Sequence, residues 1–315
     1  MPDLSSPLPP PVIVLAGPTG VGKSKIAGKI AQEHNCVIIN ADSRQVYADF
    51  PVITAQPDQV EQSLAPHKLY AFLACEEKCN AAQYANYARR EILLAREAGK
   101  IPLLVGGTGL YLQTLLAGLS PIPAVDSAVT DFWRRECADK GPQELHNYLQ
   151  TRDAKTAAKL HPNDSQRITR ALAVLTGTGR PLSCWQSLPP QKVPYRVLPL
   201  YLDLPLEAIT PRLEARINSM IEQGAVEEAR LARERCNNSR APGWSGIGCA
   251  ELFTYLEGKT DFANCKKVWL AHTRAYAKRQ ITWFKRDLTL RRVPPQKEIF
   301  LMDICRHFLD LHASA

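Results

Sequence analysis

The sequence predicts an α/β protein in which helices flank a parallel sheet and an all-helical insertion interrupts the chain. Three observations support this fold class: a phosphate-binding loop between a strand and a helix, further buried strands that end in polar or glycine-rich turns, and a long stretch without strand patterns. The 315 residues, 45% of them hydrophobic, are enough for one large or two modest domains. No apolar stretch approaches the roughly 20 residues that cross a bilayer, so no membrane contact is expected.

The phosphate-binding loop, residues 17–24, has the pattern G-x-x-x-x-G-K-[ST]. Residues 12–16 before it form an apolar run typical of a buried parallel strand, and residues 25–33 after it have helical spacing. Glycines let backbone N–H groups turn toward phosphate oxygens, and the helix N-terminus adds partial positive charge. Lys23 reaches the outer phosphates, and Ser24 can hold a Mg²⁺ ion. This context predicts a P-loop NTPase-like core, whose phosphate-binding residues are Gly17, Pro18, Thr19, Gly20, Val21, Gly22, Lys23 and Ser24.

Two more buried strands are predicted at residues 37–42 and 101–105. The first ends in the carboxylate of Asp42, and the second runs into the glycine-rich turn at 106–111. Because carboxyl ends of parallel strands meet at the ligand crevice, Asp42 should lie near the phosphate loop. Two roles are open at this point: orienting a Mg²⁺ shell, or acting as a general base.

Helical patterns account for much of the remaining core. Residues 48–80 are expected to be irregular, whereas 81–99 form a helix that Gly99 ends. After a strand at 197–202, Thr210 and Pro211 should open a helix as its cap and first residue. The last long helix is predicted at 262–286.

The composition changes after residue 123, and 124–195 is polar, helical and free of strand patterns. Asp164 is expected to cap a helix at 165–176 whose outer face carries Arg167 and Arg170. The predicted organisation is a disordered lead-in at 1–11, a core of 12–123 and 196–293, a helical insertion at 124–195 and a tail at 294–315.

The formal net charge is +8, and the last long helix carries far more basic than acidic residues. Helical spacing puts four of its basic residues in one stripe, namely Lys267, Arg274, Lys278 and Lys285. An adjacent stripe contains Trp269, Thr273, Tyr276, Gln280 and Trp283. The second stripe is either part of the core or, with the basic residues, a surface for RNA bases and backbone.

The nine cysteines are scattered, and no His or Cys pairs lie near the Cys75–Cys79 spacing, which argues against zinc. Reduced thiols and the lack of an export signal favour the cytoplasm, and a monomer is expected.

Several motifs occur together in one order along residues 12–290. They are Gly17-Pro-Thr-x-x-Gly-Lys-Ser24, Asn40-Ala-Asp-Ser-Arg-Gln-Val-Tyr47, Gly106-Gly-Thr-x-x-Tyr111, His161-Pro-Asn-Asp164 with Gln166-Arg167, and Ala277-Lys-Arg-Gln-Ile-Thr-Trp283. In this combination the chain resembles the bacterial tRNA dimethylallyltransferases. The resemblance implies transfer of a dimethylallyl group from its diphosphate to the exocyclic amine of the adenosine immediately 3′ of the anticodon.

The resemblance also implies roles for individual residues. Asp42 takes the proton from the adenine amine, Thr108 touches the same nucleotide, and Arg216 clamps the diphosphate; with Thr19 these make up the expected catalytic set. Mg²⁺ at Ser24, dimethylallyl diphosphate and the tRNA anticodon stem-loop are the expected cofactor and partners, together with nucleotide (ATP) binding at the loop. The residues expected to bind tRNA are Asp42, Ser43, Arg44, Gln45, Thr108, Gln166, Arg167, Ile168, Thr169, Arg170, Trp244, Lys278, Arg279, Gln280, Trp283 and Lys285.

One motif departs from the family pattern. Cys249 and Ala250 stand where many members have an aromatic and then a basic residue, and Trp244 is a candidate to replace that tRNA contact. Three other functions share part of the pattern: a nucleotide or small-molecule kinase, a prenyltransferase for free nucleotides, and a non-catalytic RNA-binding P-loop protein. The basic helix argues against the first, and the helical insertion with Arg167 and Arg170 argues against the second.

Overall fold

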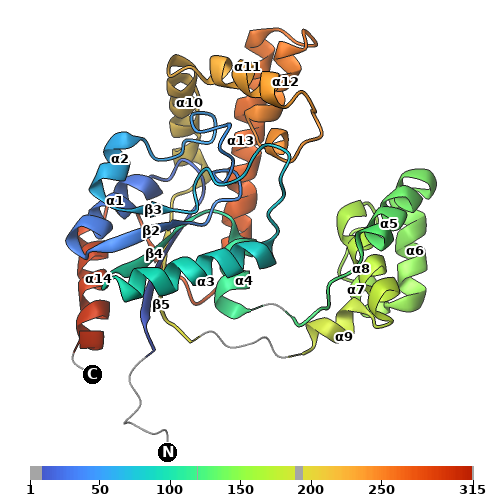
Figure 1. Ribbon diagram of the computed structural model, residues 1–315, viewed down its shortest axis with the longest axis horizontal. Coiled ribbons are helices and arrows are strands. Elements are labelled where there is room, and N and C mark those ends of the chain that lie inside the picture. Colours follow the sequence, from blue (N-terminus) through green and yellow to red (C-terminus); the bar gives the residue numbers. More distant parts are fainter. Residues whose placement is uncertain (1–8, 119, 189–193, 314–315) are drawn as a thin grey trace, which may run out of the picture. The chain divides into compact units, whose positions relative to one another are not determined.

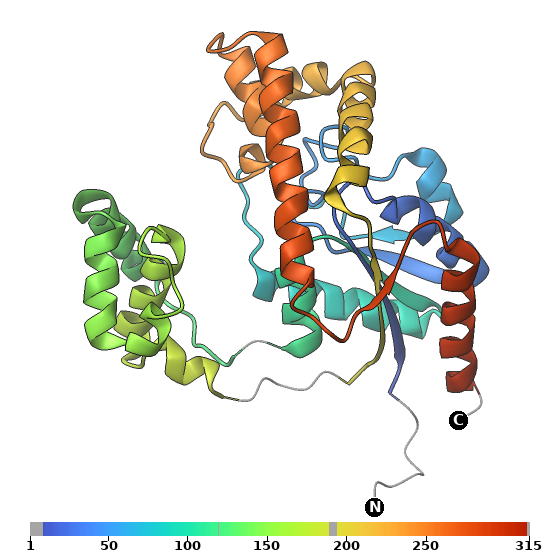
Figure 2. The ribbon, with the colours of Figure 1, turned by 180° about the vertical axis from the view of Figure 1, so that it is seen from behind.

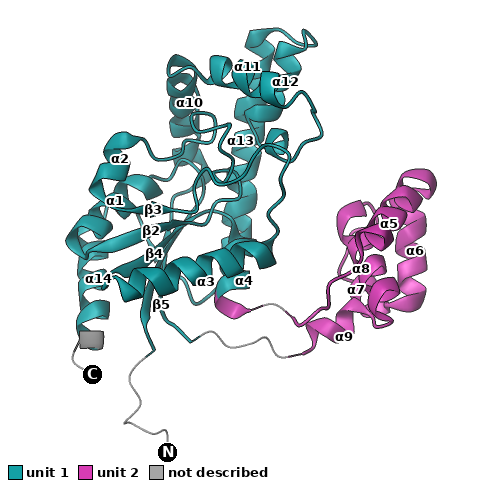
Figure 3. Ribbon diagram, viewed as in Figure 1, with its two compact units in different colours: residues 1–115, 194–315 teal, residues 116–193 magenta. Residues whose placement is uncertain are grey.

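The computed structural model describes residues 9–118, 120–188 and 194–313 and divides into two compact units (Figure 3). One unit comprises Met1–Leu115 and Pro194–Ala315, and the other Leu116–Val193. The disordered lead-in expected at 1–11 lies mostly outside the described residues, although the first strand already begins at Pro11. No helix in the described ranges is long and apolar enough to span a membrane.

The first unit contains a six-stranded sheet in which every strand pair is parallel (Figure 1). Its strand order is β3-β2-β4-β1-β5-β6. The strands are β1 (Pro11–Ala16), β2 (Cys36–Asn40), β3 (His67–Lys68), β4 (Ile101–Gly106), β5 (Arg196–Leu202) and β6 (Arg291–Val293). The helices of this unit are α1 (Lys23–Glu33), α2 (Gln59–Leu64), α3 (Ala81–Glu97), α4 (Gly109–Ala117), α10 (Leu206–Glu222), α11 (Ala225–Arg235), α12 (Cys249–Leu256), α13 (Phe262–Phe284) and α14 (Glu298–Ala313), with the short 3-10 helix η1 (Gly243–Ser245). The predicted α/β class with a P-loop-like parallel sheet is therefore confirmed.

The core follows from the two-residue period of the strands. Alternate side chains, such as Ile13 and Leu15 of β1 and Leu103 and Val105 of β4, are buried in one cluster with residues of α1 and α14. Helix α3 contacts β2 and β4 and covers the other face of the sheet (Figures 1 and 2). Because both faces are covered, all six residues of β1 are buried, which explains its continuous apolar run.

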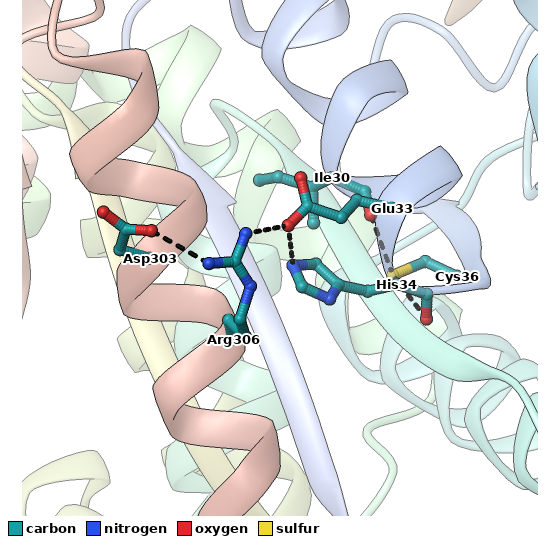
Figure 4. A network of polar contacts seen from close by, with 6 residues as sticks. All are labelled: Ile30, Glu33, His34, Cys36, Asp303 and Arg306. Carbon is teal, nitrogen blue, oxygen red and sulfur yellow. Dashed lines mark hydrogen bonds and ion pairs between the residues drawn. The ribbon is translucent and has the colours of Figure 1, made fainter.

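Residues 294–315, predicted to be a tail, contain a helix that belongs to the core. Helix α14 buries Leu301 and Cys305 against the sheet. Figure 4 shows its polar anchor: Arg306 contacts Glu33 at the end of α1 at 2.6 Å and Asp303 of its own helix at 3.2 Å. The prediction was wrong because these contacts join segments far apart in the sequence, which a local pattern does not reveal.

Two further element predictions were wrong. The stretch 48–80, expected to be irregular, contains α2 and the two-residue strand β3. Helix α10 begins at Leu206 rather than at Thr210, and Pro211 lies inside it. Pro211 is the sixth residue of this helix, and it lacks the N–H that would otherwise donate to the Glu207 carbonyl one turn earlier.

The second unit is a small helical bundle without strands in its described residues. Its helices are α5 (Ser127–Lys140), α6 (Pro142–Arg152), α7 (Ala154–Ala157), α8 (Ser165–Thr178) and α9 (Leu182–Gln186). Asp164 caps α8 by accepting the backbone N–H of Arg167, as predicted. Leu149, Ile168 and Leu172 are fully buried in its separate core.

Candidate functional site

A cavity of about 950 Å³ lies in the first unit at the carboxyl ends of the strands. Its walls come from the phosphate loop, the polar segment after β2, the turn at 51–57, α10 and α13. The predicted site residues that line it are Thr19, Gly20, Gly22, Lys23, Ser24, Asp42, Ser43, Arg44, Gln45, Arg216 and Arg279. The expectation that Asp42 lies near the phosphate loop agrees with this shared cavity.

The phosphate loop has the backbone shape that an anion nest requires. Gly20 and Gly22 have φ angles of +79° and +99°, which favour glycine. A Cβ atom at Gly20 would lie 2.5 Å from the Leu213 side chain, so α10 closes tightly over the loop. The Lys23 ammonium donates to the carbonyl oxygens of Gly17 and Pro18, both at 2.9 Å. The lysine is therefore held at the loop, beside the place where phosphates bind.

Two cations share the phosphate end of the cavity. The pKa of Lys23 is lowered to about 8, mainly by burial; the Asp42 carboxylate opposes this shift, and the nearby Arg216 adds to it. Arg216 Nη1 donates to Thr19 Oγ1 at 3.4 Å. Burial also lowers the pKa of Arg216, and the charges of Asp42 and Glu61 oppose that shift. Two desolvated cations side by side favour an anion with more than one negative charge.

Asp42 is oriented by the residues around it. Its Oδ1 accepts the backbone N–H of Arg44 at 2.8 Å, and its own N–H donates to Asn40 Oδ1 at 2.8 Å. The Asn40 amide, which is fully buried, also donates to the carbonyl oxygens of Asp42 and Leu69. Asn40 was not predicted as a site residue, although a buried polar side chain two positions before a strand-end acid is a signal for it.

Thr108 does not line the cavity itself but bonds a segment that does. Its Oγ1 accepts the backbone N–H of Ser43 at 3.0 Å, and its own N–H donates to Ala41 at 3.2 Å. A Cβ atom at Gly106 would lie 2.2 Å from the Ala41 backbone, so these two strand ends are in direct contact. Thr108 therefore fixes the segment that carries Asp42, and in this structure it does not line the cavity.

The stripe on α13 that starts at Trp269 is mainly internal. Gln280 is buried: its Oε1 accepts the backbone N–H of Thr19 at 2.8 Å, and its Nε2 donates to Gly107 O at 2.9 Å. A Cβ atom at Gly107 would lie 2.1 Å from Gln280 Nε2, and one at Gly109 would lie 2.1 Å from the Trp283 ring. The prediction that Gln280 binds tRNA is corrected, because its amide joins the two glycine-rich loops.

Three other predicted tRNA contacts are buried as well. Trp244 is 1% exposed, donates from Nε1 to Cys236 O at 2.8 Å and packs edge-on against Phe50 and Phe253. Ile168 and Thr169 face the core of the second unit. Helical periodicity explains the error, since residues between two exposed arginines of a helix point inward. Cys249, at the position of the departing motif, is also fully buried.

The remaining predicted tRNA contacts are accessible. Lys278, Arg279 and Lys285 are exposed on α13, and Trp283 is 40% exposed. On α8, Gln166, Arg167 and Arg170 are exposed, and Arg167 forms an ion pair with Asp164 at 2.9 Å. Arg44 bonds Ser245 Oγ at 2.9 Å, and the Gln45 amide donates to Thr54 O and Ala55 O. The exposed basic residues of α13 and α8 can bind a large anionic partner. Arg44 and Gln45 instead hold neighbouring loops through hydrogen bonds.

The model of a family described as IPP transferase matches residues 45–287. A tRNA dimethylallyltransferase of Oleidesulfovibrio alaskensis is 49% identical over 280 residues, covering 89% of this chain and 92% of that protein. A tRNA dimethylallyltransferase of Rhodopseudomonas palustris is 39% identical over 281 residues, covering 89% of this chain and 88% of that protein.

Two solved structures are also similar. The full-length tRNA isopentenylpyrophosphate transferase of Bacillus halodurans gives a TM-score of 0.71 at 26% identity, over 97% of this chain and 98% of that one. A eukaryotic dimethylallyltransferase acting on tRNA gives a TM-score of 0.76 at 30% identity. The match covers 90% of this chain and 74% of that one.

Proposed function

Because the chain belongs to the IPP transferase family, we propose that it transfers a dimethylallyl group from dimethylallyl diphosphate to N6 of the adenosine immediately 3′ of the anticodon in tRNA, releasing diphosphate. The observation that carries this proposal is the single cavity shared by the phosphate loop and Asp42. Between these polar ends the lining includes Leu213, Ile217 and Met220, which suit a short hydrocarbon.

The loop end of the cavity binds and activates the donor. When the bond between the allylic carbon and the diphosphate oxygen breaks, negative charge builds on the diphosphate. The loop N–H groups, Lys23 and Arg216 lie where they stabilise that charge. They therefore bind the departing diphosphate more strongly than the intact donor, which accelerates the reaction.

The other end of the cavity acts on the acceptor. The adenine leaves its stack to enter the cavity, as bases do in other enzymes that modify them. As the new bond forms between N6 and the allylic carbon, N6 loses a proton, which the Asp42 carboxylate accepts. The Arg44 N–H donates to that carboxylate, and Asn40 holds the Asp42 backbone by accepting its N–H. Base catalysis of this kind contributes roughly 10²–10⁴-fold.

A divalent ion fits the loop end of the cavity. Ser24, which is exposed, and Asp42 both line the cavity and offer oxygen ligands, which Mg²⁺ prefers. No group of three or more His, Cys, Asp or Glu side chains suited to a metal lies within 9–118, 120–188 and 194–313. Ser24 would be the protein ligand of such an ion, which would supply positive charge against the leaving diphosphate.

The exposed basic residues of α13 and α8 bind the tRNA backbone, so both units contact the anticodon stem-loop. The protein is proposed to act as a monomer, and a tRNA substrate supports a cytoplasmic location.

The test is incubation of the protein with dimethylallyl diphosphate, Mg²⁺ and an anticodon stem-loop, followed by mass analysis of the digested nucleosides. We expect one dimethylallyl group on the adenosine 3′ of the anticodon and none on a stem-loop with guanosine there. Prenylation of free AMP but not of the stem-loop would favour the free-nucleotide prenyltransferase. ATP turnover with a small acceptor, without prenyl transfer, would favour the kinase.

A further inference from the structure

One wall of the cavity is a turn at 50–57 that contains no helix or strand. Ala55 in this turn has φ = +49°, in the left-handed region that residues with a Cβ atom rarely adopt. Such backbone persists only where neighbouring groups hold it in place. The side chains that hold this turn therefore set the shape of the cavity wall.

Glu228 of α11 holds the turn from outside the cavity. Its Oε2 accepts the backbone N–H of Val52 at 2.7 Å, and its Oε1 accepts that of Ile53 at 2.8 Å. Charge-assisted bonds from both carboxylate oxygens fix two successive residues at once. From the other direction, the Gln45 amide donates to the carbonyl oxygens of Thr54 and Ala55. Four consecutive residues of the turn are thus bonded to just two side chains.

Helix α11 also supports the opposite wall. Its buried Ala225 and Ala229 lie in one apolar cluster with Ile53 of the turn and with Ile217 and Met220 of α10. Met220 stands one helical turn beyond Arg216, and both line the cavity. Along one helical turn, this wall therefore changes from the cationic Arg216 to apolar side chains. An allylic diphosphate has a matching arrangement, with an anionic diphosphate followed by a hydrocarbon.

We propose that Glu228 is a positioning residue that limits the room for the donor's hydrocarbon and so selects a five-carbon allylic diphosphate against longer ones. The proposal rests on the proposed function. Lys23, Arg216, Val52 and Met220 line the same cavity. A donor with its diphosphate at the two cations would therefore direct its carbon chain toward Val52 and Met220. A turn held by two bonds to the half-buried Glu228 carboxylate resists moving aside for a second isoprene unit. Burial raises the pKa of Glu228, consistent with its enclosed position.

The test compares Glu228→Ala and Glu228→Gln with the wild type, using dimethylallyl and geranyl diphosphates at saturating stem-loop. We expect Glu228→Ala to raise KM for dimethylallyl diphosphate about tenfold and to lower the five- over ten-carbon ratio of kcat/KM at least tenfold, with KM for the stem-loop unchanged. Glu228→Gln should fall between, because its amide oxygen accepts one N–H while its NH₂ group opposes the other. Glu227→Ala is the control: it removes an adjacent, exposed carboxylate that pairs with Arg230.

An unchanged ratio in Glu228→Ala, or an equal loss in Glu227→Ala, would overturn the proposal. If Glu228→Ala does not fold, Val52→Ala enlarges the same space from the turn itself, and it too must lower the ratio. Calorimetric binding of the two diphosphates without tRNA separates this inference from the proposed function. Preference for the five-carbon compound that is lost in Glu228→Ala supports the inference even if no tRNA is modified. Equal binding of both compounds by the wild type contradicts it.

Discussion

Lys23 is a cavity residue whose charge changes between pH 7 and pH 9. Its pKa is about 8, lowered mainly by burial, so the ammonium is mostly charged at pH 7 and mostly neutral at pH 9. A polyanionic ligand such as a diphosphate binds the charged form better. We therefore expect the affinity for dimethylallyl diphosphate to fall about tenfold between pH 7 and pH 9.

Calorimetry at pH 7, 8 and 9 measures this slope. Lys23→Arg is the matched control, since arginine stays charged throughout and should give a flat profile. An equal slope in Lys23→Arg would assign the pH dependence to another group.

A substitution at Asp42 distinguishes an effect on substrate binding from an effect on the chemical step. Asn at this position keeps an oxygen that accepts the Arg44 N–H but cannot take a proton from N6. We expect Asp42→Asn to lower kcat by roughly 10²–10⁴ while the affinities for donor and stem-loop change less than twofold. Single-turnover kinetics and filter binding measure the two quantities. If affinity and rate fall together, Asp42 binds substrate rather than acting as the base.

At the scale of elements, α13 joins an exposed basic surface to the candidate site. Gln280 bonds both glycine-rich loops, and the Gly107 backbone leaves no space for a Cβ atom. Gly107→Ala should displace Gln280 from the Thr19 N–H, shift the phosphate loop and lower kcat/KM by about 10²-fold, equivalent to about 2.7 kcal/mol. Gln280→Leu should do the same.

Steady-state kinetics with stem-loop binding tests this role. Stem-loop affinity should remain within twofold of the wild type in both variants. Thr282→Ala, which alters an exposed residue on the same helix, should leave kinetics unchanged. Weaker stem-loop binding with normal turnover would instead support the surface role that the sequence suggests for Gln280.

Sequence patterns predicted the elements whose residues act locally. The buried strands β1, β2 and β4, the phosphate loop and the Asp164 cap are each encoded by adjacent residues. What they did not predict depends on distant partners. Trp244 looks like an exposed aromatic in a polar loop, yet Phe50 and Phe253 enclose it. Glu228 likewise has no local signal, because its partners lie 175 and 176 positions away.

At the scale of the whole molecule, a net charge of +8 is divided between two units that each expose basic residues. Lys278 lies on α13 of the first unit and Arg170 on α8 of the second. If both bind phosphates of one stem-loop, each contributes independently to counterion release. The salt dependence of binding then reports how many units the RNA contacts.

We therefore expect Lys278→Ala and Arg170→Ala each to reduce the slope of log K against log salt concentration by about one, and the double variant by about two. Fluorescence anisotropy with a labelled stem-loop between low and moderate salt measures these slopes. Lys29→Ala is the charge-matched control, because Lys29 is ion-paired with Glu298 away from the cavity and should leave the slope unchanged. A double variant no different from Lys278→Ala would show that α8 does not touch the RNA backbone. An equal effect of Lys29→Ala would assign the dependence to overall charge, since removing any one cation would then weaken binding alike.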